Sequence, residues 1–248
     1  MACALDQRRC GDGAKRGEVP ASLCAMCHAR RFAVCGALAE AELPSFAALS
    51  SHLRFAAGQT ISEEGAPADW VFSVVSGVIG LHKSLPDGRR QTTGFLFAGD
   101  VVGLPSRVVN TCAAEAITEV EVCRFSRARF EAYMDDHPAL RARLLRMTAD
   151  ELSAAHEQML LLGRKTARER VASFLLLLAD RAASRQLPAN PVVLPMKRLA
   201  IADYLGLTIE TVSRTVTNLA RAGVIELVDT HTVRIASIFA LRHAAGVR

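Results

Sequence analysis

Residues 199–219 read LAIADYLGLTIETVSRTVTNL, and this order of residues predicts two short helices joined by a glycine turn. Gly206 can adopt the left-handed backbone conformation that such a turn needs, and Ala202 is small where the two helices must approach closely. The stretch therefore predicts a helix-turn-helix, for which sequence-specific DNA is the first ligand to consider. The apolar contacts between the two helices are expected from Leu205, Leu207 and Val212.

The second helix of this motif carries the residues expected to contact bases. Thr208 can cap its N-terminus, and a negative charge at Glu210 suits the first turn because of the helix dipole. Glu210, Ser213 and Arg214 are spaced i, i+3 and i+4, so they share one face. Arginine can donate two hydrogen bonds to guanine, a carboxylate can accept from cytosine and a small hydroxyl tolerates several bases. An ordinary surface ion pair is the alternative, and the turn glycine with its preceding helix favours the DNA interpretation.

The C-terminal part of the chain also fits a DNA-binding domain. Residues 224–228 and 232–235 are short β-like runs that predict a two-stranded wing. Residues 164–248 hold 13 Lys and Arg against 6 Asp and Glu, a net charge of +7, whereas residues 1–163 hold 17 against 19, a net charge of −2. A basic domain that binds RNA or an anionic membrane would show the same imbalance, but the helix-turn-helix favours DNA.

Length and composition set the outer bounds of the fold and the compartment. The 248 residues suffice for two compact domains, and no apolar run is long enough to cross a bilayer, although half of the residues are apolar. The first ten residues lack the apolar core of a signal peptide, so we expect a cytoplasmic protein without membrane association. Because disulfides are rare in that compartment, the seven cysteines need another explanation.

Three of these cysteines are closely spaced near the N-terminus. Cys24, Cys27 and Cys35 fall within twelve residues, and no carboxylate lies between residues 19 and 39. The basic side chains of Arg30 and Arg31 lie in the same segment, and nearby positive charge favours thiolates. The spacing fits an iron–sulfur cluster, a structural zinc ion, or a metal-free thiol switch, and spacing alone does not separate iron–sulfur from zinc.

Either metal site needs a fourth ligand, for which Cys112 and Cys123 are the candidates. Residues 119–125 alternate, so Cys123 shares a strand face with two glutamates and opposes two valines. We expect it to point outward, toward the N-terminal arm. Cys112 alternates with small alanines and is better explained as a buried hydrophobic cysteine. Cys3 and Cys10, in a polar tail, are left out of the site.

The middle of the chain predicts a small antiparallel barrel or roll. Glycines interrupt residues 46–125 too often for long helices, and strands are expected at residues 70–77, 78–83 and 91–97. Residues 86–88 form a Pro-Asp-Gly sequence that predicts a hairpin turn. Rolls of this kind commonly hold ligands.

Several of these stretches resemble a known family. The sequences GQTISEEG at 58–65, FSVVSG at 72–77 and FAGDVVG at 97–103 resemble the cyclic-nucleotide-binding roll of the CRP/FNR superfamily of bacterial transcription regulators. The resemblance covers nearly the whole chain. The cysteine arm, Cys123 and the ETVSR sequence at 210–214 resemble the FNR branch, whose members respond to oxygen.

This resemblance implies an α+β fold and a division of the chain into four parts. The parts are a cysteine-rich N-terminal arm at 1–38, a cyclic-nucleotide-binding-like β-roll sensor domain at 39–135, a dimerisation helix at 136–164 and a winged helix-turn-helix DNA-binding domain at 165–248.

The resemblance also implies a cofactor and partners. In FNR-like proteins three arm cysteines and one roll cysteine hold a 4Fe-4S cluster, which favours iron–sulfur over zinc in this chain. The implied operator is an inverted repeat of TTGAT-type half-sites in double-stranded promoter DNA. The implied protein partners are a second copy of the chain and RNA polymerase, as for an activator. The matching cluster positions are Cys24, Cys27, Cys35 and Cys123.

Two departures from the family pattern concern ligand binding. Cyclic-nucleotide-binding members have an acidic residue and an Arg-Ser/Thr pair for the phosphate, where this chain has Leu104-Pro105 and Thr111-Cys112. Although Arg107 lies nearby, we do not expect a cyclic nucleotide to bind, because a partly buried phosphate needs its charged partner. The gap between the last two arm cysteines is seven residues, longer than in the best-known FNR pattern, and a longer loop can still close on a cluster.

The predicted helix at 138–164 has a pattern suited to pairing with a second helix. A parallel dimer along this seam would place two recognition helices about one DNA turn apart, and the alternative is a helix packed only on its own roll. At Ala155 the FNR branch often has an acidic residue that opposes pairing, so we predict a dimer less dependent on the cluster than in the typical member. The seam residues are Leu145, Thr148, Leu152, Ala155, Met159 and Leu162.

Two other classes of protein compete with this interpretation. One is a CRP-family regulator that senses through zinc, thiols or a small ligand and has no iron–sulfur cluster. The other is an enzyme with an appended DNA-binding domain. The sequence holds no glycine-rich phosphate loop after a strand, no nucleophile with a nearby base and no HExxH helix, so we expect no enzymatic activity.

Overall fold

The computed structural model describes residues 17–18, 24, 26–103 and 108–247, and the chain divides into two compact units at residues 1–149 and 150–248. Cys3, Cys10 and the departures at residues 104–107 lie outside the described residues. None of the described helices is both long enough and apolar enough to cross a membrane.

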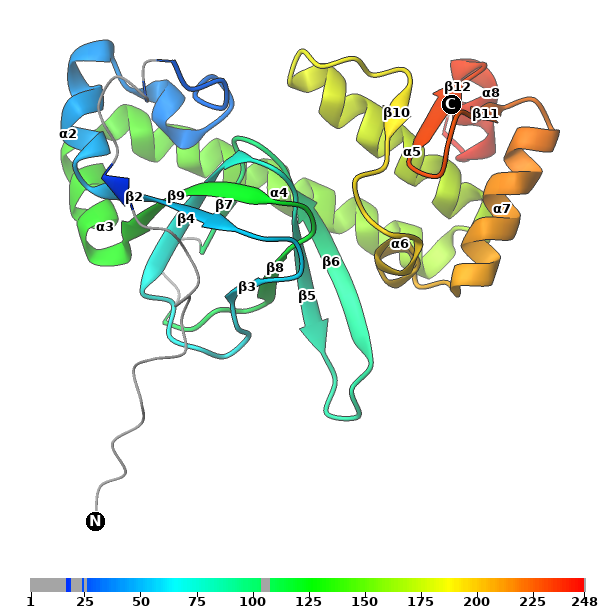
Figure 1. The fold of residues 1–248 in the computed structure, drawn as a ribbon, viewed down its shortest axis with the longest axis horizontal. Coiled ribbons are helices and arrows are strands. Elements are labelled where there is room, and N and C mark those ends of the chain that lie inside the picture. Colours follow the sequence, from blue (N-terminus) through cyan, green and yellow to red (C-terminus); the bar gives the residue numbers. More distant parts are fainter. Residues whose placement is uncertain (1–16, 19–23, 25, 104–107, 248) are drawn as a thin grey trace. The chain divides into compact units, whose positions relative to one another are not determined.

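The first unit is built around two antiparallel sheets that face each other (Figure 1). One sheet has the strand order β1-β2-β9-β4-β7, and the other has the order β3-β8-β5-β6. The bounds are β1 Gly17–Glu18, β2 Ser50–Phe55, β3 Thr60–Ser62, β4 Trp70–Ser76, β5 Ile79–Ser84, β6 Arg90–Leu96, β7 Val101–Val102, β8 Ala113–Ala116 and β9 Val120–Ser126.

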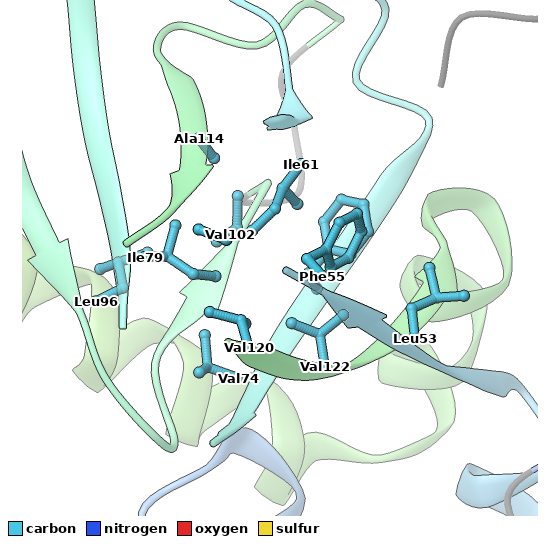
Figure 2. Close-up of a cluster of buried hydrophobic side chains, with 12 residues drawn as sticks. Leu53, Phe55, Ile61, Val74, Ile79, Leu96, Val102, Ala114, Val120 and Val122 are labelled. Carbon is cyan, nitrogen blue, oxygen red and sulfur yellow. The ribbon is translucent and has the colours of Figure 1, made fainter. Parts of the chain in front are cut away.

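The core of this roll lies between the two sheets, and Figure 2 shows its side chains converging from both. In β9, Val120 and Val122 are fully buried on the inner face, whereas Cys123 takes the opposite face. The turn between β5 and β6 is closed by the amide of Gly88, which donates to the carbonyl of Leu85 at 2.9 Å. The core members are Leu53, Phe55, Ile61, Phe72, Val74, Ile79, Leu96, Val102, Ala114, Ala116, Val120 and Val122.

A second apolar cluster covers the outer face of the β2-β9-β4 strands. It joins the N-terminal arm to α3 (Arg127–Asp136) and to the start of α4 (Pro138–Arg164), and the arm lies beside both helices in Figure 1. The rings of Phe46 and Phe125 are 4.7 Å apart between centroids. The arm contributes η1 (Val34–Ala37), η2 (Glu40–Glu42) and α2 (Leu43–Ala47). The cluster comprises Val34, Leu38, Leu43, Phe46, Val71, Phe125, Phe130, Met134, Leu140 and Leu144.

The second unit has a helical core beside a small three-stranded sheet of order β10-β12-β11. Its first complete helix, α5, starts at a capping box in which Thr166 and Glu169 satisfy each other's backbone amides. The bounds are α5 Ala167–Ser184, β10 Val192–Val193, α6 Arg198–Leu205, α7 Ile209–Arg221, β11 Ile225–Leu227, β12 Thr232–Ile235 and α8 Ile238–Ala244.

The predicted α+β fold class, with a roll, a long helix and a winged helix-turn-helix, is confirmed. The strands expected at 70–77, 78–83 and 91–97 correspond to β4, β5 and β6 with ends shifted by one residue. The sequence pattern did not predict β10, because a strand of two residues after a proline leaves no periodic signal.

Candidate nucleic-acid interface and cysteine site

The turn of the helix-turn-helix has the geometry that its glycine predicts. Helix α6 ends at Leu205, and Gly206 then takes φ +59° and ψ +42°, the left-handed conformation. The amides of Gly206 and Leu207 both donate to the carbonyl of Ala202, which closes the end of α6. Helix α7 begins after Thr208, whose hydroxyl accepts from the amide of Thr211 at 3.2 Å.

The two faces of α7 differ sharply in exposure. Val212 and Leu219 are fully buried, and they hold the helix against the domain. Glu210, Ser213 and Arg214 are all exposed, as expected for residues that contact bases. The Glu210 amide and the Thr208 hydroxyl donate to the Glu210 carboxylate, which lowers its pKa and keeps it ionised.

Arg170 of α5 ties the helix-turn-helix to the end of α4 within the second unit. Its Nη1 donates to the carbonyl of Leu205 at 2.8 Å, and its Nη2 donates to the carbonyl of Leu162 at 2.9 Å. Gln158 of α4 adds a bond of 2.7 Å to the carbonyl of Tyr204. The sequence pattern did not predict this arrangement, because nothing in the spacing separates Arg170 from the surface arginines around it.

Comparisons with known proteins agree with both halves of this architecture. Residues 52–137 match the cyclic nucleotide-binding domain family, and residues 169–244 match the Crp-like helix-turn-helix domain family. The transcriptional activator protein FnrL of Cereibacter sphaeroides is 43% identical over 92% of this chain and 95% of its own length. The chain belongs to the CRP/FNR family of transcription regulators.

Other relatives extend this CRP/FNR assignment. The nitrogen fixation regulation protein FixK of Bradyrhizobium diazoefficiens is 42% identical over 83% of this chain and 86% of its own length. The solved structure of FixK2 from Bradyrhizobium japonicum is similar with a TM-score of 0.74 and 38% identity, covering 79% of this chain and 96% of that one. The chain is accordingly a DNA-binding transcription regulator and not an enzyme.

In this CRP/FNR family member, the structure brings the four predicted cluster cysteines into one neighbourhood. Cys24, Cys27, Cys35 and Cys123 are all free thiols and all half-buried. Cys123 lies in the middle of three strands, opposite His52 of β2 and Ser73 of β4. Cys35 and Cys123 both pack against the outer apolar cluster that joins the arm to α3 and α4.

Burial and mutual proximity change the acidity of these thiols. Burial raises the pKa of Cys35 to about 12, and the thiols of Cys27 and Cys24 add to this effect. Burial likewise raises the pKa of Cys123 to about 12, with further contributions from the three arm cysteines. In the described part of the chain, no group of three or more His, Cys, Asp or Glu side chains is arranged to hold a metal ion. The four thiols therefore lie near one another but are not arranged as a closed metal site.

The arm segment between Cys27 and Cys35 is compact. The amide of Ala33 donates to the carbonyl of Ala29 at 2.9 Å, and both side chains are buried. The guanidinium of Arg30 donates to the carbonyl of Leu38 at 3.2 Å, and its charge acts to lower the pKa of Cys24 and Cys35. This basic residue therefore partly offsets the effect of burial.

Cys112 lies apart from this group, close to Thr93 of β6, whose hydroxyl is 3.8 Å from its sulfur. The expectation that Cys112 is buried was wrong: Cys112 is half-buried and lies one residue before β8, which begins at Ala113. The alternation with the alanines of β8 therefore does not extend to this position.

The predicted dimer seam runs along α4. Leu145, Leu152 and Met159 recur every seven residues and are 70%, 57% and 63% exposed. Thr148 and Ala155 are also exposed and lie between them on the helix. Leu162 differs: it is half-buried, and its Cδ2 would lie 3.1 Å from a Cβ added at Gly206. The seam remains a prediction, and its last residue is turned toward the helix-turn-helix.

Proposed function

We propose that this protein is an oxygen- or redox-responsive transcription regulator that senses through a 4Fe-4S cluster and binds its operator as a dimer. The ligands would be Cys24, Cys27, Cys35 and Cys123. The observation that carries the proposal is that Cys35 of the arm and Cys123 of β9 pack against the same apolar cluster, with Cys24 and Cys27 near enough to act on both thiols. Far-separated parts of the sequence thus supply one group of thiols.

The donor set fits this cofactor. Four thiols are the usual ligands of a 4Fe-4S cluster, and the apolar cluster beside Cys35 and Cys123 would limit solvent access. Because burial keeps these thiols protonated, loading would release protons, as metal binding to thiols generally does. When bound, the cluster would supply an iron–sulfur core that reacts with oxygen.

The response to oxygen would pass from the arm to the dimer through packed residues of the chain. Val34 and Leu38 pack the arm against α3 and the start of α4, so the order of the arm and the position of α4 are linked. The exposed Leu145, Leu152 and Met159 are suited to pair with the same residues of a second copy. Loss of the arm's order would weaken this pairing and lower DNA affinity.

The operator is read by α7 of each subunit. The exposed Arg214, Ser213 and Glu210 would face the base edges of TTGAT-type half-sites in an inverted repeat. The lowered pKa of Glu210 keeps it an acceptor, suited to a cytosine amino group. RNA polymerase is the proposed further partner, in keeping with relatives named as transcriptional activators.

The test is to purify the protein under strict exclusion of air. The absorbance spectrum, the iron content and the acid-labile sulfide are measured before and after exposure to air, with operator affinity measured in parallel. We expect a brown protein that loses its chromophore and binds the operator more weakly after exposure. Protein without iron or sulfide that binds the operator normally would exclude the proposal.

A cluster-free regulator is the second candidate, and the relatives named FixK favour it, since they match about as closely as FnrL does. The four thiols would then hold zinc or act as a thiol switch. Colourless protein that binds DNA equally with and without oxygen would support this candidate. A protein that is colourless but loses affinity on thiol oxidation would indicate the switch.

A further inference from the structure

Arg143 of α4 reaches the segment of the arm that carries the cysteines. Its Nη2 donates to the carbonyl of Phe32 at 2.8 Å and lies 3.5 Å from the carbonyl of Arg31. Its Nε is buried and has no hydrogen-bond partner among the described residues. The guanidinium thus gives up part of its solvation to make this contact, so the contact depends on the arm staying in place.

The same arm segment is held from its other side by the roll. Gly99, in the turn before β7, has φ +96°, and an added Cβ would lie only 2.6 Å from the Cβ of Phe32. No side chain other than hydrogen fits between the turn and the arm at this point. Phe32 is therefore fixed between the Gly99 turn and Arg143, three residues before Cys35.

The position of Arg143 on α4 connects this contact with the seam. Arg143 precedes Leu145, the first exposed seam residue, by two positions in the same helix. Leu144, between them, is buried in the cluster that also holds Val34 of the arm. A change in the arm at Phe32 therefore acts on the turn of α4 where the seam begins.

We infer that Arg143 is a positioning residue that couples the state of the cysteine arm to the dimerisation helix, an inference that rests on the function proposed above. When the arm is ordered around its cysteines, Arg143 binds the Phe32 carbonyl and holds the first turns of α4 in the orientation that pairs. When the arm loses its order, the guanidinium loses its acceptor and returns to solvent.

The inference predicts a specific change in coupling. Arg143→Gln removes the charge and shortens the side chain, so the bond to Phe32 is lost. Arg143→Lys keeps the positive charge and one donor nitrogen on a side chain somewhat shorter than that of arginine. Arg146→Gln is the matched control, since Arg146 is an exposed arginine three residues further along α4. The readout is the ratio of operator dissociation constants after and before air, measured on full-length protein, with iron and sulfide quantified.

We expect the wild-type ratio to fall in the usual range for coupled sites, about 5- to 150-fold. Arg143→Gln should retain its cluster and bring the ratio close to one, Arg143→Lys should give an intermediate ratio, and Arg146→Gln should match the wild type. Sedimentation should show the same order for dimerisation. A residue with a merely structural role would weaken both states alike and leave the ratio unchanged.

The alternative outcomes separate this inference from the proposed function. An unchanged ratio in Arg143→Gln with full cluster content would overturn the role of Arg143 alone. Loss of the cluster from Arg143→Gln but not from Arg146→Gln would also overturn it, since Arg143 would then support cluster binding and not coupling. Wild-type protein without a cluster, or with a ratio of one, would remove the proposed function and this inference together.

Discussion

The helix-turn-helix formed by α6 and α7, called the reading head below, and the cysteine site differ in how far apart in the sequence their supporting contacts lie. In the reading head, α6, the Gly206 turn and α7 lie within 24 consecutive residues, and the turn and cap are closed by bonds inside that stretch. The cysteine site joins the arm to β9 across almost ninety residues of sequence, and its support comes from α3 and α4. The turn and the cap of the reading head are thus closed by local bonds, with Arg170 and Gln158 adding support from outside the stretch, whereas the cysteine site depends throughout on tertiary contacts.

Electrostatics show the same contrast. Glu210 is exposed and has a lowered pKa, so its charge is available to a ligand at any physiological pH. Cys35 and Cys123 have pKa values raised to about 12, so they stay neutral until a ligand replaces their protons. The carboxylate of Glu210 is thus ionised at neutral pH, whereas the thiols of Cys35 and Cys123 are neutral at that pH.

The largest effect should come from removing one buried thiol. Cys123→Ser should abolish the cluster, because the hydroxyl is a poor substitute for a thiolate and β9 offers no other thiol. Cys112→Ser is the matched control and should keep the full cluster, since Cys112 lies beside Thr93 and apart from the arm. The measurement is iron and sulfide per chain after anaerobic reconstitution. A full cluster in Cys123→Ser would contradict this prediction, since the cluster would then need no ligand from outside the arm.

The next effect concerns thiol chemistry in the cluster-free protein. With pKa values near 12, Cys35 and Cys123 hold about a thousandfold fewer thiolates at pH 8 than an ordinary thiol, so alkylation should be slower by a similar factor. Peptide mass spectrometry after iodoacetamide treatment measures these rates, with the same thiols in urea-unfolded protein as the reference. Equal rates in folded and unfolded protein would show that the thiols are not protected.

The same raised pKa values predict how stability depends on pH. The folded state favours the neutral thiols, so their contribution is fully present below about pH 9 and is lost as the pH rises toward 12. Urea unfolding of the cluster-free protein should therefore show a free energy of unfolding that falls over this interval. Replacing Cys35 by Ala should make the fall shallower, whereas a slope equal to the wild type would exclude a contribution from Cys35.

A smaller effect is expected at the reading face. Arg214→Ala should weaken operator binding by about 1–3 kcal/mol and relax the preference at one base pair, because a bidentate contact to guanine is lost. Arg221→Ala, at the last turn of the same helix, serves as the comparison and should leave the base preference unchanged. Titrations against the operator and single base-pair variants measure both effects. A uniform loss for Arg214→Ala would mark it as a phosphate contact.

How far the sequence predicts each region follows from the same difference. Thr208 as a cap, Gly206 as the turn and the exposed face of Glu210 and Arg214 could all be read from neighbours in sequence, since short-range bonds determine them. The contacts of Arg143 and Arg170 cannot be predicted from the sequence, because both bind backbone carbonyls, which every residue offers equally. Only the folded chain reveals which carbonyl an arginine reaches.

The cysteine site falls between these cases. Strand alternation, a local signal, predicts that Cys123 points outward. The structure agrees, since Val122 is buried in the inner core and Cys123 lies on the other face of β9. Alternation also favours Cys123 over Cys112 as the fourth thiol, and the resemblance to the FNR branch adds the 4Fe-4S cluster that the four cysteines would hold. For Cys112 the local signal misled, because the strand starts one residue later.

The smallest predicted effect tests whether the N-cap of α7 affects the stability of the helix-turn-helix without affecting the response to air. Thr208→Ala removes the hydroxyl that accepts from the Thr211 amide and should destabilise the domain by about 1 kcal/mol, as loss of an N-cap usually does. Thr208→Ser keeps the acceptor and should restore most of the stability, as measured by urea unfolding. Because the cap acts only within α7, the ratio of operator affinities before and after air should stay at its wild-type value in both variants. A change in that ratio would mean that the start of α7 takes part in the response to air, and that the helix-turn-helix is not independent of the cysteine site.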